Sequence, residues 1–201
     1  MIVYSHLAMI PFVILAMSMV RVLINYSSLL AKNTNDDPDD DVIWYWPHSI
    51  FSFITFSTII LFWWTSSPLR DLNYYPNDGW NLFTFLLYLS VPFLFFMVTE
   101  VIAPQLEEHK NKEVNLQEYY YKHHRVILGL AVLLQLCLLA NLFVFFKGEL
   151  LSLKVAGRVI MLCIMTPMVF SNNKRLHEIG MGIFFVGFIY TVIKYHIFPV
   201  I

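Results

Sequence analysis

The stretch Val126 to Phe146, VILGLAVLLQLCLLANLFVFF, decides the fold class of this chain. It contains no charged residue, and a helix that crosses the hydrocarbon core of a bilayer needs about 20 residues of this kind. Five more apolar stretches accompany it along the chain. The six predicted spans are Met1 to Arg21, Ser49 to Thr65, Trp80 to Ala103, Val126 to Phe146, Val159 to Phe170 and Ile179 to Phe198. The sequence therefore predicts an all-α integral membrane bundle of six transmembrane helices with short loops, forming a single domain over residues 1–201.

The composition fits this class and argues against others. Hydrophobic residues make up 58% of the chain and charged residues 13%, about half the charged share of a soluble domain. The net charge of -1 and the lack of a basic stripe argue against a nucleic-acid partner. Hydrolase, nucleotide-binding and thiol-redox motifs are missing, so an enzyme is not the expected class. No cofactor is expected, and His6 with His196 is the only pair that would suit a haem.

The distribution of Lys and Arg predicts the orientation of the bundle. In a six-span topology, the links after the first, third and fifth spans hold eight basic residues, and the other links with the C-terminal end hold five. Because Lys and Arg accumulate in cytoplasmic loops, both termini are predicted to lie outside the cytoplasm, in the cell membrane. Tryptophans such as Trp46 and Trp64 fall near span ends, where amphipathic rings settle at the level of the headgroups.

Polar residues cluster at the predicted cytoplasmic end of the first and third spans. Arg21, Asn25 and Ser28 share one helical face if the first helix continues past the membrane. Glu100 reaches the same level from the third span, so we expect it to pair with Arg21 and offset its charge. The pair would either lock the two helices together or take part in permeation.

Three histidines form a second pattern. His48, His124 and His177 each stand where an even-numbered helix begins, on the predicted cytoplasmic side. If they converge, they would bind a metal or sense pH, and the alternative is that they lie among lipid headgroups. No particular metal is predicted.

A narrow polar line is predicted to run inward from His48. Ser52 and Thr55 follow it at helical spacing, and Gln135 lies near mid-depth of the fourth span. Such residues either hydrate a path or form hydrogen bonds between helices. The acidic run Asp36 to Asp41 lies in a polar link and is interpreted as solvated loop, because it lacks the glycine and glutamate positions of a calcium-binding loop.

Several short motifs together resemble a family of small, uncharacterised multi-spanning bacterial membrane proteins. The resemblance covers the whole length but not the acidic run, and it implies an architecture without an assigned activity. It is carried by Arg21, His48, Trp63-Trp64, Leu69-Arg70, Pro104, Tyr119-Tyr120-Tyr121 before Arg125, and Asn173-Lys174-Arg175-Leu176-His177.

These patterns lead to three functional hypotheses. The first is a small channel or transporter for ions or small solutes, acting alone or as a homo-oligomer. Its polar cytoplasmic mouth and permeation path would be formed by Arg21, Asn25, His48, Ser52, Thr55, Glu100, His124, Gln135 and His177. The second is a non-conducting membrane subunit or sensor that anchors a partner protein, and the third is a membrane enzyme acting on a lipid or quinone.

Overall fold

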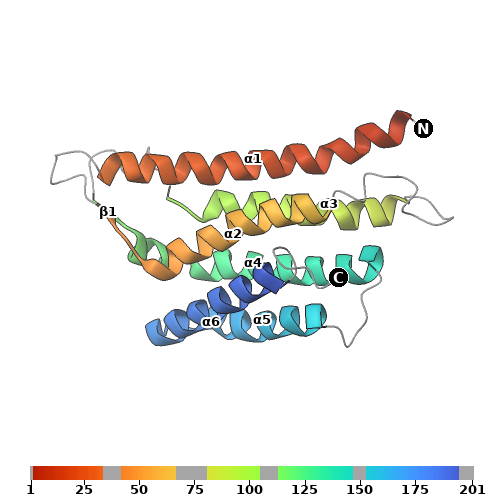
Figure 1. The fold of residues 1–201 in the computed structure, drawn as a ribbon. Helices are drawn as coiled ribbons and strands as arrows, with labels where there is room; N and C mark the ends of the chain where they lie inside the picture. Colours follow the sequence, from red (N-terminus) through yellow and green to blue (C-terminus); the bar gives the residue numbers. More distant parts are fainter. Residues whose placement is uncertain (1, 34–41, 67–80, 105–112, 147–152, 195–201) are drawn as a thin grey trace.

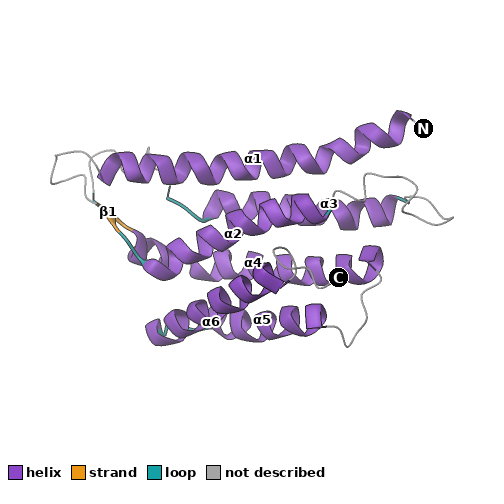
Figure 2. Ribbon diagram, in the orientation of Figure 1, coloured by secondary structure: helices purple, strands orange, loops and turns teal. Residues whose placement is uncertain are grey.

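The computed structural model describes residues 2–33, 42–66, 81–104, 113–146 and 153–194. Helix accounts for almost all of these residues (Figure 2), so the predicted all-α class is confirmed. The elements are α1 (Ile2–Asn33), β1 (Val42–Ile43), α2 (Trp46–Thr65), α3 (Leu82–Val101), β2 (Val114–Asn115), α4 (Leu116–Phe146), α5 (Leu153–Phe170) and α6 (Lys174–Val192).

Five of the six helices are long and apolar enough to cross a membrane, by length and composition. These segments are Met9–Asn33, Trp46–Thr65, Leu82–Val101, Leu116–Phe145 and Lys174–Val192. The remaining apolar segment, Val155–Phe170, is shorter. It contains the predicted span Val159 to Phe170, which is shorter than the roughly 20 residues that a bilayer requires.

The helices form two layers. α1, α3, α4 and α5 lie side by side in that order, and α2 and α6 pack across them (Figure 1). Successive helices run in opposite directions, so α1, α3 and α5 end where α2, α4 and α6 begin. We call this end of the bundle the histidine end, because His48, His124 and His177 all lie near it.

Two helices are longer than the sequence predicts. α1 continues to Asn33 and α4 begins at Leu116, so each is about 45–48 Å long at 1.5 Å per residue, well beyond a core of about 30 Å. The expectation that Leu116 to Arg125 belong to the polar link between the third and fourth spans is therefore wrong. Their side chains pack on neighbouring helices at the histidine end, and this packing stabilises helix outside the apolar span.

Side chains close in sequence cap several helix starts. The Asn81 side chain accepts the Thr84 backbone N–H at the start of α3, and the Thr84 hydroxyl accepts the Asn81 backbone N–H in return. Asn115 accepts two backbone N–H groups at the start of α4, and Asn173 accepts one at the start of α6. Each cap satisfies donors that the first helical turn leaves free.

Apolar side chains fill the space between the two layers. One buried cluster joins α2, α3, α4, α5 and α6 and includes Phe51, Val98, Leu128, Met168 and Met181. A second joins the first four helices around Phe95 and Ile59. α5 and α6 approach closely at Gly180, where a Cβ atom would lie 2.6 Å from the Met168 sulfur. Small residues permit this kind of contact between helices.

The outward faces of the helices are also apolar. Leu23, Phe83 and Val186 are among many large hydrophobic side chains that are more than half exposed. A soluble monomer rarely exposes so much contiguous apolar surface, so these faces suit contact with lipid. Exposed tryptophans lie at both ends of α2, Trp46 at its start and Trp64 near its end.

Candidate functional site

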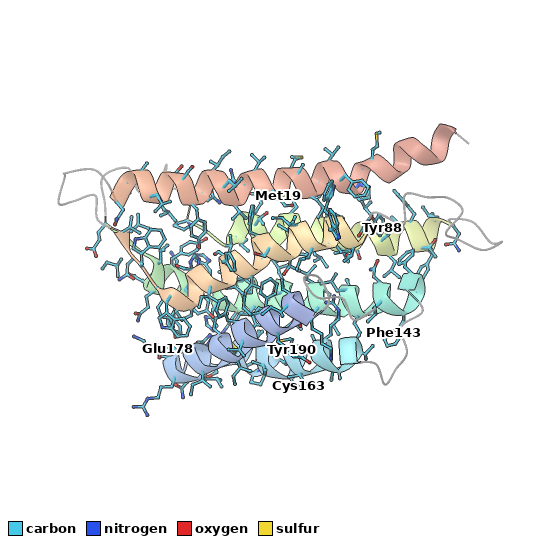
Figure 3. All side chains as sticks on the ribbon, in the orientation of Figure 1. Met19, Tyr88, Phe143, Cys163, Glu178 and Tyr190 are labelled. Atoms are coloured by element: carbon cyan, nitrogen blue, oxygen red, sulfur yellow. The ribbon has the colours of Figure 1, made fainter. Side chains whose placement is uncertain are left out.

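Titratable rings gather at the histidine end of the bundle, in what we call the His–Tyr cluster. They come from the segment before α2, from the first turns of α2 and α4, and from the start of α6. Side chains fill the same part of the molecule in Figure 3, where Glu178 marks the start of α6. The members of the cluster are Tyr45, His48, Tyr119, Tyr120, Tyr121, His124 and His177.

Tyr120 is the centre of the cluster. Its ring is fully buried, and its centroid lies 5.5 Å from that of His177, 6.2 Å from that of His48 and 6.3 Å from that of His124. The His124 and His177 rings are also in contact, with centroids 5.2 Å apart and planes nearly perpendicular. The three histidines therefore surround one tyrosine.

All three histidines lie inside the protein. Their exposed fractions are 0% for His48, 2% for His124 and 0% for His177. The alternative that these side chains lie among lipid headgroups does not fit such buried positions. Elsewhere on the same end, His123 is partly exposed and its ring lies against that of Tyr119.

The cluster satisfies backbone carbonyls at the ends of two helices. His48 Nε2 bonds the carbonyl of Ile102, and the Tyr119 hydroxyl donates to the carbonyls of Val101 and Ala103 at 3.0 and 3.2 Å. These three carbonyls end α3. His177 Nε2 lies 2.7 Å from the carbonyl of Ser171, directly after α5. The last carbonyls of a helix have no partner within it, so side chains from other helices supply the donors here.

The backbone contacts fix the tautomer of each ring, because a carbonyl oxygen can only accept a hydrogen bond. His177 carries a proton on Nε2, and its Nδ1 is left to accept from the Tyr120 hydroxyl at 2.8 Å. His124 carries its proton on Nδ1, which donates to the Tyr121 carbonyl at 2.7 Å. Its Nε2, like Nδ1 of His48, is buried and finds no hydrogen-bond partner among the described residues.

A pair of tyrosine hydroxyls closes the outer side of the cluster. The hydroxyls of Tyr45 and Tyr121 lie 2.9 Å apart. Burial, followed by the hydrogen bond to Tyr121 and by nearby Glu178, raises the pKa of Tyr45 well above its usual range. Tyr45 therefore stays neutral and acts as a hydrogen-bonding group rather than as an acid.

The histidines do not form a metal centre in the part of the chain that the structure describes. No three His, Cys, Asp or Glu residues in these segments are placed to share an ion. The rings of His124 and His177 are in contact with each other, and the ring of His48 is in contact with that of Tyr120. The ring arrangement suits proton exchange and hydrogen bonding.

The predicted ion pair between α1 and α3 is confirmed. Arg21 donates to the Glu100 carboxylate at 2.9 Å, and the two side chains are 36% and 33% exposed. Asn25 and Ser28, which were expected on the same face, are half-buried. The pair ties α1 to α3 at the rim of the bundle.

Two of the predicted path residues form hydrogen bonds within their own helix. The Ser52 hydroxyl donates to the carbonyl of His48, and the Thr55 hydroxyl donates to that of Phe51. Gln135 accepts a hydrogen bond from Arg158 of α5 at 3.0 Å. Thr55, Thr58 and Gln135 also line a cavity of about 20 Å³ between the helices, enough for one water molecule.

Sequence reasoning missed several residues of this site. Tyr45, Tyr119, Tyr120 and Tyr121 were not selected as functional candidates, nor was Arg158. The sequence did contain a signal for one contact of the cluster, because Tyr120 and His124 are four residues apart and share a face if the segment is helical. It was lost because this segment was expected to be a link. The acidic run Asp36 to Asp41, Leu69-Arg70, His196 and the side chain of His6 lie outside the described residues.

Comparisons of the chain with protein-family models, with curated proteins and with solved structures found no match. The resemblance to a bacterial membrane family therefore stays a prediction.

Proposed function

We propose that this protein is a non-conducting membrane sensor subunit, which responds to acidification at its histidine end and transmits the change to a partner protein. The observation that carries this proposal is the burial of three histidines around Tyr120, where side chains from α2, α4 and α6 meet. Histidine is the side chain whose ordinary pKa lies closest to physiological pH. A cluster that joins several helices would convert protonation into a rearrangement of those helices.

The same geometry gives less support to a channel mouth at this position. Most of the polar side chains proposed for the mouth bond to backbone carbonyls or to each other. Such groups stabilise helix ends and helix contacts. A hydrated entrance would instead need polar groups that face an open passage.

A channel or transporter is the second candidate, and one observation favours it. Thr55, Thr58 and Gln135 converge on a water-sized cavity inside the bundle. A cavity with these three polar side chains on an otherwise apolar lining would be one station of a hydrated path. The lipid or quinone enzyme has no comparable feature in its favour.

Flux measurements separate the two candidates. The purified protein would be reconstituted in liposomes, and ion flux would be followed between pH 5 and 8 against empty liposomes. The sensor proposal predicts no excess flux at any pH. It also predicts that acid lowers the protection of backbone amides from hydrogen exchange, relative to the intrinsic rate at each pH, in the first turns of α4 and α6. Excess flux that depends on Gln135 would favour the channel, and protection that is the same at pH 7.5 and 5 would contradict the sensor.

We also propose that all six helices cross the membrane, with the histidine end in the cytoplasm. Support comes from the basic residues Lys122, Arg125, Lys174 and Arg175 at that end. A cysteine at Asn172, in a variant without Cys137 and Cys163, should react with impermeant thiol reagents only after the cells are opened. A cysteine at Leu82, at the opposite end, is the matched control and should react in intact cells. The reverse pattern would invert the orientation.

A further inference from the structure

Two imidazoles lie at the contact between α4 and α6 at the histidine end. His124 of α4 and His177 of α6 are both buried with their rings in contact. His177 is further joined to α4 by its hydrogen bond with Tyr120. Lys174 of α6 also donates to the side chain of Gln117 of α4 at 3.4 Å on the exposed surface, and further along the helix Gly180 packs on Met168 of α5.

We propose that His124, Tyr120 and His177 form a proton-operated latch, which holds the first turn of α6 on α4 while both imidazoles are neutral and releases it when they are protonated. This inference rests on the proposed sensor function and names the moving part. The latch has a defined neutral state, because the backbone carbonyls of Ser171 and Tyr121 fix where each ring carries its proton.

An added proton on His177 must go to Nδ1, the atom that accepts from Tyr120. Two donors would then face each other across 2.8 Å, so the Tyr120 hydroxyl must turn and become the acceptor. Its own hydrogen would have to find an acceptor in a shell of rings that includes Tyr45 and His48. The hydroxyl hydrogen loses its present acceptor, and a positive charge is placed on a ring that is fully buried, so the docked position of α6 becomes less favourable.

An added proton on His124 must go to Nε2. This atom is buried and finds no acceptor in the described part of the chain, so its charge would be left unpaired. Charges on both rings would also repel each other across a centroid separation of 5.2 Å. Either protonation step therefore opposes the docked position of α6.

Among the residues that the structure describes, the titratable groups around the pair do not supply a free counter-charge. From α4 these groups are Tyr120 and Tyr121, and from the segment that enters α2 they are Tyr45 and His48. α5 contributes the Ser171 backbone carbonyl directly after its last turn. On α6 itself, Glu178 is already paired with Lys174 at 3.9 Å. Acidification is thus expected to move α6 rather than to be neutralised in place.

The experiment measures the distance between α4 and α6 directly. Spin labels would be attached to cysteines at the exposed positions Glu118 and Leu176, in a variant without Cys137 and Cys163, and the protein would be placed in lipid nanodiscs. Between pH 7.5 and 4.5 we expect the label distance to lengthen by several ångströms and its distribution to broaden. An unchanged distance over this range would overturn the latch.

One histidine variant tests whether His177 is needed for the change in distance, and a second serves as its control. In His177→Gln, the side-chain amide can donate to Ser171 and accept from Tyr120, and only His124 is left to be protonated, so the distance should lengthen much less on acidification than in the unaltered protein. His123→Gln is the matched control, because His123 lies on the partly exposed rim, and it should respond to acid like the unaltered protein. A full response in His177→Gln would also overturn the latch.

The outcome separates this inference from the proposed function. If acid changes hydrogen exchange at the histidine end while the distance between Glu118 and Leu176 stays constant, the latch is wrong and the sensor stands. If neither measurement responds to acid, both proposals fail.

Discussion

The two ends of the bundle satisfy their backbone groups in different ways. At the end where α3 begins, Asn81 and Thr84 cap each other within one turn, and the backbone N–H of Ser66 bonds back to the last turn of α2. At the histidine end, carbonyls that close α3 receive donors from His48 and from Tyr119, which lie in other helices. The histidine end has local caps as well, at Asn115 and Asn173, and in addition its carbonyls are bonded by side chains distant in sequence.

This difference shows why the histidine end is the better place for a regulated change. A local cap stabilises only its own helix, so losing it frays a single turn. A bond from the side chain of one helix to the end of another stabilises their relative position as well. Titratable groups at such joints couple protonation to helix packing, which the opposite end cannot do through Asn81 and Thr84.

The largest expected effect comes from the centre of the His–Tyr cluster. Tyr120→Ala should lower the free energy of unfolding by about 3–5 kcal/mol, because it empties a fully buried position. Phe95→Ala, in the apolar cluster of the other half, should cost about the same and serves as the control. Tyr120→Phe should cost about 1–3 kcal/mol, since it only leaves His177 Nδ1 without its donor.

Reversible unfolding in mixed detergent micelles would provide these values. If Tyr120→Phe proved as stable as the unaltered protein, the hydrogen bond to His177 would not contribute to the packing of α6. The two ends would then differ less than their contacts suggest.

The next effect compares a distant cap with a local one. His48→Leu leaves the carbonyl of Ile102 buried without its donor, so we expect a loss of about 1–3 kcal/mol. Asn81→Ala removes the cap of α3 and should cost about 1 kcal/mol. The same unfolding measurement would test both variants, and a larger loss for Asn81→Ala would reverse the comparison.

The smallest effect is expected at the rim. Arg21 and Glu100 are each about one-third exposed, so solvent screens their attraction and the coupling should be at most about 1 kcal/mol. A double-mutant cycle of Arg21→Met and Glu100→Gln isolates this coupling from the single losses. Strictly additive losses would show that the pair contributes nothing, and a coupling of several kcal/mol would place it in a far less polar environment.

The sequence by itself determined the helical class, the approximate positions of six helices and the pairing of Arg21 with Glu100. These follow from local composition, because a long apolar run needs a helix to satisfy its backbone in lipid, and a charge near the end of such a run needs a partner.

Only the tertiary structure decided that His48, His124 and His177 are buried around Tyr120. The bonds that bury them join residues far apart in the chain, such as Tyr120 and His177, and depend on how α2, α4 and α6 pack. The same packing extends α4 back to Leu116 through residues whose polarity indicates a loop. Hydropathy measures how each segment prefers lipid or water, but it contains no information about which helix ends meet, and that meeting creates the site.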